Sequence, residues 1–161
     1  MAPSGAAADA PMASPACPCS SGRPLRTCCL PFIDGKAEPP TPTALMRSRY
    51  AAFALKGVDY LWRTLARDHE DRRRAEADVK RELRATATRF KYPGLTILDA
   101  QGEDPAAPAR VLFHARVFEK GRDRSFIEAS RFVFEDGGWR YLDGEFRPIP
   151  TEKEALAALR L

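Results

Sequence analysis

Apolar side chains between residues 44 and 90 recur with a helical period. Met46, Tyr50 and Phe53 are three or four residues apart and share one helical face, and Val79 and Leu83 repeat this spacing further along. We expect helices over residues 45–55, 58–66 and about 75–90, the first of them capped by Thr43.

The period changes to strand alternation after Tyr92-Pro93-Gly94, a sequence that breaks a helix. Apolar and polar residues then alternate, as is typical of half-buried strands. Asp136-Gly137 lies between two apolar runs and predicts a tight hairpin. We expect a strand that starts at residue 95 and further strands over 110–117, 125–134 and 139–146. Helices followed by a run of antiparallel strands predict an α+β fold.

Composition divides the chain into five segments. Residues 1–16 are mostly Ala, Pro, Ser and Gly, cannot bury an apolar face and are expected to be disordered. Residues 17–35 contain all four cysteines, and the sequence KAEPPTPT at 36–43 is typical of a stiff linker. Residues 44–147 form the core-like domain, and residues 148–161 are a C-terminal tail or a short helix.

Length and charge narrow the class of protein. A chain of 161 residues is long enough for one domain with its own core. Its net charge of +4 is too small to indicate nucleic-acid binding by itself. No apolar stretch approaches the roughly 18 residues that would span a membrane, so we expect no membrane insertion. The first 16 residues lack the basic and apolar regions of a secretory signal, so we expect a cytoplasmic protein.

The cysteines lie in two pairs, Cys17 with Cys19 and Cys28 with Cys29, in the sequence CPCSSGRPLRTCC. Four soft thiolates at this spacing suit one tetrahedral Zn²⁺ ion, and they leave no coordination position for a catalytic water. The spacing therefore predicts a structural zinc knuckle with these four ligands. Two disulfides, or four free reduced cysteines, are the alternatives.

The knuckle sequence resembles the SEC-C motif, a zinc knuckle also found at the carboxyl end of the SecA translocation ATPase. All four ligand positions match, although Ser20 stands where the motif usually has Gly. With LMRSRYAAFALKGVDYLWRT, YPGLTILD and EASRFVFEDGGWRYLDG, it makes residues 17–147 resemble the bacterial YchJ family. The resemblance implies a nuclear-transport-factor-2-like (cystatin-like) fold: a curved antiparallel sheet packed on about three helices, with an internal pocket. It implies no particular reaction.

The hairpin at Asp136-Gly137 predicts which side chains face that pocket. Because side chains alternate along a strand, the aromatic face of the hairpin is expected to be the concave one. We expect the opposed pairs Phe134–Trp139, Phe132–Tyr141, Ser130–Asp143 and Glu128–Glu145. The pocket candidates are Arg49, Tyr50, Tyr60, Trp62, Glu128, Ser130, Phe132, Trp139, Tyr141 and Asp143.

Arg49 lies within the apolar arc of the first helix, and we expect a buried arginine to need a carboxylate partner. We expect it to meet Glu128 or Asp143. That pair would either tie the helix to the sheet or anchor a polar ligand, and a solvent-exposed Arg49 is the third alternative. No catalytic residue is assigned, because arginine would lower the pKa of Asp143 and make it a weak base. His69 and His114 are expected at the surface.

Three kinds of function are consistent with these features. The first is a binding or adaptor module that docks a protein partner through the knuckle, without enzymatic activity. The second is a nuclear-transport-factor-2-like domain that binds, or acts on, a small molecule in the aromatic pocket. The third is a nucleic-acid or ribosome contact through Arg23, Arg26 and the Arg72–Arg74 run, whose acidic neighbours favour a solvated helix start instead.

Overall fold

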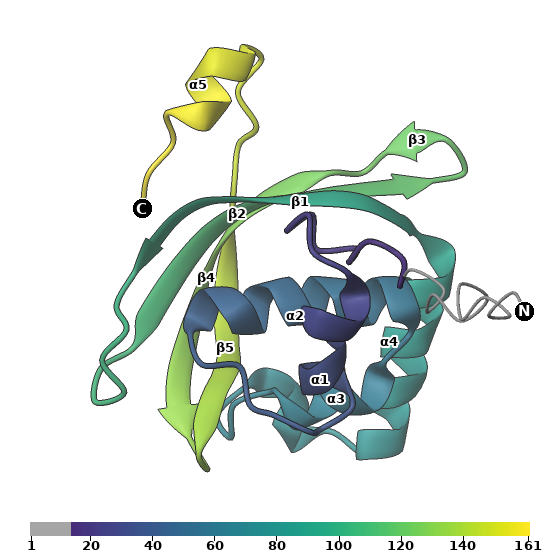
Figure 1. The fold of residues 1–161 in the computed structure, drawn as a ribbon, viewed down its shortest axis with the longest axis vertical. Coiled ribbons are helices and arrows are strands. Elements are labelled where there is room, and N and C mark those ends of the chain that lie inside the picture. The colour runs from purple at the N-terminus through teal and green to yellow at the C-terminus, as the bar shows by residue number, and fades with distance from the viewer. Residues whose placement is uncertain (1–13) are drawn as a thin grey trace, which may run out of the picture.

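The computed structural model of the protein describes residues 14–161 and consists of a curved antiparallel sheet around a layer of helices (Figure 1). The sheet order is β1-β2-β4-β5, and the short β3 pairs with the end of β2. The strands are β1 Lys91–Gln101, β2 Ala109–Glu119, β3 Arg122–Asp123, β4 Phe126–Glu135 and β5 Gly138–Arg147. The expected α+β fold is confirmed.

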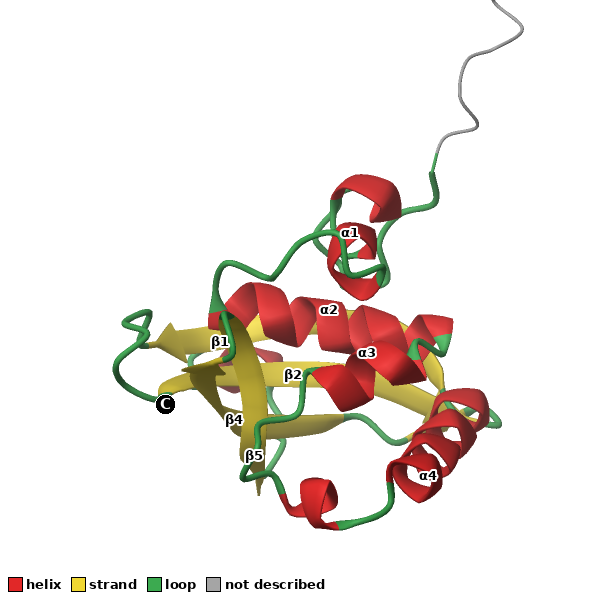
Figure 2. Ribbon diagram, turned by 90° about the horizontal axis from the view of Figure 1, so that it is seen from below, coloured by secondary structure: helices red, strands yellow, loops and turns green. Residues whose placement is uncertain are grey.

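Three helices fill the concave side of the sheet, as Figure 2 shows from below. They are α2 Pro42–Leu55, α3 Val58–Arg63 and α4 Glu76–Arg89. The first starts earlier than expected, because the hydroxyl of Thr41, not Thr43, accepts a hydrogen bond from the Ala44 N–H at 3.0 Å. Pro42 follows as the first helical residue, where its missing N–H costs nothing.

The main core lies between α2, α3 and the concave face of the sheet. Leu45 and Leu61 come from the helices, and Val111, Phe132 and Trp139 come from the strands; all are fully buried or nearly so. A second, smaller cluster covers the convex face, where the C-terminal segment with α5 Lys153–Ala157 packs on residues of β2 and β4. Figure 1 shows this segment on the opposite side of the sheet from α2.

The sequence predicts that Tyr92-Pro93-Gly94 separates α4 from the sheet. These three residues instead lie inside β1. The register against β2 shifts between Lys91 and Gly94, so this part of β1 is irregular. Proline is tolerated there because the strand is at the edge of the sheet and the irregularity removes the need for its N–H.

The hairpin of β4 and β5 has the expected register near its turn only. Phe134 lies opposite Trp139 and Phe132 opposite Tyr141, but the register shifts between Arg131 and Phe132. Beyond that bulge the pairs are Arg131–Asp143, Ser130–Gly144, Ala129–Glu145 and Glu128–Phe146. The predicted pairs Ser130–Asp143 and Glu128–Glu145 are therefore wrong. The extra residue lies in β5, and it moves every following side chain of β5 to the other face of the sheet.

The remaining short elements are η2 Leu25–Thr27, α1 Leu30–Ile33 and η3 Glu70–Arg73. Residues 14–16, predicted as part of a disordered tail, pair with the cysteine segment, where Ala16 forms a β-bridge with Pro24. Residues 1–13 of that predicted tail lie outside the described part of the chain. Within residues 14–161, no helix combines the length and apolar composition needed to cross a membrane.

Candidate metal centre and ligand cavity

The four cysteines are brought to one point by two turns. Ser20 and Gly22 have φ values of 64° and 81°, and the Cys17 N–H donates to the Arg23 carbonyl at 2.9 Å, which reverses the chain. Cys28 and Cys29 follow η2 and precede α1. All four thiols are free and buried, and their sulfur atoms lie within 4.8 Å of one another.

The sulfur–sulfur distances identify the kind of site. Cys19 Sγ lies 3.6 Å from Cys28 Sγ, and Cys28 Sγ lies 3.8 Å from Cys29 Sγ. These separations are far longer than a disulfide bond of about 2.05 Å. The hydroxyl of Ser21 approaches Cys28 Sγ at 3.2 Å and provides a polar contact to the cluster. The cluster is therefore a set of four convergent soft donors, suited to one metal ion.

Crowding sets the acidity of these thiols. Hydrogen bonding with Cys29 lowers the pKa of Cys19 to about 4. The same contact, together with burial, raises the pKa of Cys29 far above its ordinary range. Burial also raises the pKa of Cys17 to about 11. Four thiols this close can all ionise only beside a cation, because each thiolate disfavours the next.

The knuckle, residues 17–35, is docked on the domain. Arg47 on α2 donates to the Cys19 carbonyl at 2.9 Å, and the Leu95 N–H in β1 donates to the Ser20 hydroxyl at 3.1 Å. Ala51 on α2 packs against the cysteine cluster. Figure 2 shows the knuckle on the side of α2 that faces away from the sheet. The sequence places the knuckle outside the core on a linker and does not reveal these contacts.

The linker is also fixed in place. Glu38 pairs with Arg63 at 3.1 Å and with Arg140 at 3.0 Å, so it joins α3 to β5. Arg63 in addition donates to the Phe32 carbonyl of α1 at 3.0 Å. Pro39 is fully buried. Glu38 thus fixes the linker on the domain, and Arg63 connects the domain to the knuckle directly.

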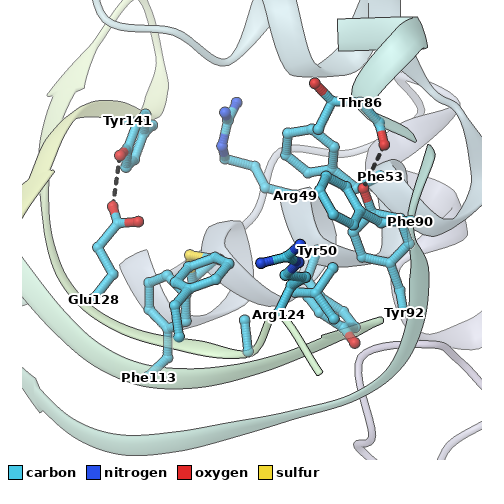
Figure 3. A pocket seen from close by; sticks show the side chains of 14 residues that line it. Arg49, Tyr50, Phe53, Thr86, Phe90, Tyr92, Phe113, Arg124, Glu128 and Tyr141 are labelled. Atoms are coloured by element: carbon cyan, nitrogen blue, oxygen red, sulfur yellow. Dashed lines mark hydrogen bonds between the residues drawn. The ribbon is translucent and has the colours of Figure 1, made fainter. Parts of the chain in front are cut away.

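A cavity of about 320 Å³ opens between α2, α4 and the concave side of the sheet (Figure 3). Figure 3 shows Tyr141 and Glu128 on one side and the aromatic rings of Phe53, Phe90 and Tyr92 on the opposite side. The lining is mainly apolar, and its polar groups are few. The lining residues are Met46, Arg49, Tyr50, Phe53, Thr86, Phe90, Tyr92, Phe113, Ala115, Val117, Arg124, Phe126, Glu128 and Tyr141.

Arg49 is buried at 6% exposure, and burial lowers its pKa from the ordinary value, although guanidinium stays protonated. Its Nη1 donates to the Leu61 carbonyl at 2.9 Å and to the Thr64 hydroxyl at 2.6 Å. The guanidinium carbon lies 4.8 Å from the centre of the Tyr141 ring. The predicted ion pair with Glu128 or Asp143 is therefore wrong: the end of α3 and an aromatic face are the partners of Arg49.

Glu128 and Asp143 have other partners. Glu128 Oε1 accepts hydrogen bonds from the Tyr141 hydroxyl at 2.6 Å and the Ser130 hydroxyl at 2.8 Å. Asp143 lies on the convex face, where it forms a double hydrogen bond with Arg131. This contact lowers the pKa of Asp143, as expected beside an arginine, but the arginine is a different one. The bulge between Arg131 and Phe132 is the reason for the change of face.

The structure brings four of the ten predicted pocket residues together at the cavity: Arg49, Tyr50, Glu128 and Tyr141. The other six lie elsewhere. Phe132 and Trp139 are in the main core, and Tyr60 is buried with its hydroxyl 2.5 Å from that of Ser48. Trp62 lies under the guanidinium of Arg72 at 4.5 Å. Ser130 contacts Glu128 from outside the lining, and Asp143 is on the other face.

Sequence reasoning missed several aromatic residues of the cavity lining. Phe113 lies on the apolar side of the predicted strand 110–117, so its alternation could have indicated a pocket position. Phe90 and Tyr92 come from the junction of α4 and β1, where the sequence predicts a break.

His69 does not lie at the surface, where the sequence predicts it. This residue is 9% exposed beside Tyr141, and its Nδ1 accepts a hydrogen bond from the Asp71 N–H at 3.0 Å.

The fold and the two sites define a class of protein: a nuclear-transport-factor-2-like domain with a four-cysteine knuckle docked on its first long helix. The family model described as "YchJ, middle NTF2-like domain" matches residues 41–144. The chain therefore belongs to the YchJ family. A UPF0225 protein of Deinococcus radiodurans is 42% identical over 127 residues, which cover 79% of this chain and 86% of the relative. The UPF0225 protein YchJ of Shigella dysenteriae is 38% identical over 128 residues, covering 80% and 81%.

Two solved structures are also similar. The solution structure of a SEC-C motif containing protein from Rhodopseudomonas palustris matches with a TM-score of 0.68 and 32% identity, over 80% of this chain and 96% of that one. The crystal structure of a SEC-C motif containing protein from Psychrobacter arcticus matches with a TM-score of 0.67 over 88% of both chains. At 23% identity, the second likeness shows the fold alone.

Proposed function

We propose that the protein binds one Zn²⁺ ion through Cys17, Cys19, Cys28 and Cys29 and uses the knuckle to dock a partner protein. Zinc–sulfur bonds of about 2.3 Å in a tetrahedron place the sulfurs about 3.8 Å apart. The observed separations of 3.6 and 3.8 Å support this ion. Four thiolates complete its coordination, so its role is structural: it holds the turn and η2 together. A reducing, cytoplasmic compartment suits such a site.

Metal analysis of the purified protein tests the zinc site. We expect about one zinc per chain in the wild type and loss of that zinc in Cys28→Ser, because serine is a poor ligand for zinc. Thr27→Ala is the matched control, since the exposed Thr27 hydroxyl contacts only the Pro24 carbonyl among residues 14–161. A wild-type protein without zinc after growth with added zinc, or full zinc in Cys28→Ser, would contradict the proposal.

The outer side of the knuckle supports the docking role. Arg23, Arg26 and Thr27 are exposed, whereas the inner side of the knuckle packs on α2. Metal-dependent folding would hold this basic surface in one conformation. A partner with an acidic surface fits it best. Nucleic acid is the alternative partner for the same arginines, and it would give binding that weakens steeply with salt.

Affinity purification from native lysate tests docking. The wild type should retain a partner that is lost both in Cys28→Ser and in the double variant Arg23→Glu/Arg26→Glu. Arg84→Glu serves as the control, because Arg84 is an exposed arginine of α4 and lies outside the knuckle. The same set of retained proteins in all four samples would refute docking through this surface.

The cavity supports a second function, small-molecule binding. Its volume of about 320 Å³ is within the range of ligand sites, which are mostly apolar with a few placed polar groups. The observation that favours this function is Arg49, a buried charge on the cavity wall. We assign no catalytic step to the cavity.

A further inference from the structure

Arg49 has hydrogen-bond donors that the protein does not use. Only its Nη1 is bonded, to Leu61 and Thr64, and no acceptor within residues 14–161 contacts its Nε or Nη2. Over the same residues, Arg72 Nε is the one side-chain polar atom that is both fully enclosed and unpartnered. The free donors of Arg49 are therefore not sealed in protein. They belong to a side chain that is 94% buried on the cavity wall, so they are available to a molecule inside.

Glu128 presents an acceptor to the same space. The hydroxyls of Tyr141 and Ser130 both bind its Oε1, and no donor in the described chain contacts its Oε2. Arg49 and Glu128 both line the cavity but do not form an ion pair, because Arg49 lies over the Tyr141 ring while Glu128 is bonded to the hydroxyl of that ring. The cavity thus offers cationic N–H donors over the face of the Tyr141 ring and a carboxylate acceptor at the hydroxyl of that ring (Figure 3).

This pair of charges selects against charged ligands. A carboxylate would pair with Arg49 but would place a second anion beside Glu128 in an apolar cavity, where repulsion is poorly screened. A cation would meet the same difficulty at Arg49. A neutral group with one acceptor and one donor satisfies both residues. The opposite wall, formed by Phe53, Phe90 and Tyr92, suits a flat ring.

We infer that the cavity binds a neutral, flat, ring-containing molecule through a carboxamide or lactam edge. Its carbonyl accepts from the free donors of Arg49, and its N–H donates to Glu128 Oε2. The rest of the molecule lies among the aromatic rings, and its outer end reaches Arg124, whose side chain is 52% exposed. The inference rests on the second proposed function and adds the chemical class of the ligand.

Three naphthalene derivatives of similar shape test this inference: 2-naphthamide, 2-naphthoate and 2-methylnaphthalene. Each is titrated into the full-length protein at pH 7.5, and binding is followed by NMR. A hydrogen bond to a charged group is worth about tenfold or more in affinity. We expect 2-naphthamide to bind at least tenfold more tightly than either other probe. Glu128→Gln, which removes the negative charge, should shift the amide-to-carboxylate preference at least tenfold toward 2-naphthoate. Asp143→Asn, the same change on the convex face, should leave the preference unchanged.

The outcomes separate the two levels of the proposal. Binding of 2-naphthoate as tight as that of 2-naphthamide in the wild type, or an unchanged preference in Glu128→Gln, overturns the inference. Equal binding of all three probes overturns it as well but leaves ligand binding by the cavity intact. No shift of cavity resonances with any probe overturns the ligand-binding function itself. The wild-type comparison decides the inference even if the Glu128 variant folds poorly.

Discussion

The hydroxyl of Tyr50 joins β1 to β2 at the irregular start of β1, which makes Tyr50→Phe an informative substitution. The hydroxyl donates to the Arg116 carbonyl at 2.8 Å and accepts from the Gly94 N–H at 2.8 Å. The side chain is 3% exposed, and burial raises its pKa to about 12, so the hydroxyl keeps its proton at any practical pH. These bonds lie where the register shifts between Lys91 and Gly94 and where Gly94 comes to lie opposite Arg116.

The cost of this substitution follows from the two bonds. Each hydrogen bond contributes about 1 kcal/mol, and a buried N–H left without a partner costs about 1–3 kcal/mol. We therefore expect Tyr50→Phe to lower the free energy of unfolding by about 2–3 kcal/mol, with little change in the ring packing. Urea unfolding followed by tryptophan fluorescence measures this difference, and its denaturant slope should stay that of the wild type.

Tyr92→Phe is the matched control. The ring of Tyr92 lies 5.7 Å from that of Tyr50, but its hydroxyl makes one exposed bond of 3.2 Å, to the Thr86 carbonyl. Losing an exposed bond should cost no more than about 0.5 kcal/mol. Equal effects of the two substitutions, or a cost of Tyr50→Phe below about 0.5 kcal/mol, would refute the view that this hydroxyl holds the start of β1.

Two further predictions concern pH and a glycine. Burial lowers the pKa of His69, so the unfolded state binds the proton more readily, and the free energy of unfolding should fall as the pH drops below about 6.5. Urea unfolding at pH 7.5 and 5.5 should show a smaller fall in His69→Gln than in the wild type, and equal falls would contradict a buried neutral histidine. A Cβ on Gly144 would overlap the carboxylate of Glu128, so Gly144→Ala should break the bonds of Glu128 to Tyr141 and Ser130, at a cost of about 1–2 kcal/mol. Thermal or urea unfolding should show that most of this cost disappears in a Glu128→Ala background, whereas additive effects would mean that Glu128 is not displaced.

The hairpin of β4 and β5 shows how much of a strand pairing can be predicted from the alternation of apolar and polar residues. The turn at Asp136-Gly137 and the pairs Phe134–Trp139 and Phe132–Tyr141 follow from the sequence, because a two-residue turn fixes the register beside it. The bulge between Arg131 and Phe132 leaves no mark in the pattern of apolar and polar residues. It moves Asp143 away from the cavity to the convex face, where Arg131 binds it.

The partners of Arg49 were unpredictable for a related reason. The helical period places Arg49 on the buried face, but its bonds are to a backbone carbonyl and a hydroxyl at the end of α3. Main-chain acceptors exist at every helix end and carry no sequence signal. The four-cysteine cluster was predictable because four cysteines within 13 positions are brought together by local turns alone. The docking of the knuckle was not, because it depends on single polar contacts with α2 and β1.

The contact between Ser20 and the Leu95 N–H has a consequence for aggregation. An edge strand offers its unpaired main-chain groups to any extended chain, and β1 is such an edge. The hydroxyl of Ser20 occupies one of those donors at 3.1 Å. At the opposite edge, the segment after α3 covers β5, where the Ala66 N–H donates to the Tyr141 carbonyl at 2.8 Å. Unfolding of the knuckle would expose part of β1. The cysteine cluster, by keeping the knuckle folded, therefore also limits edge-to-edge association between copies of the protein.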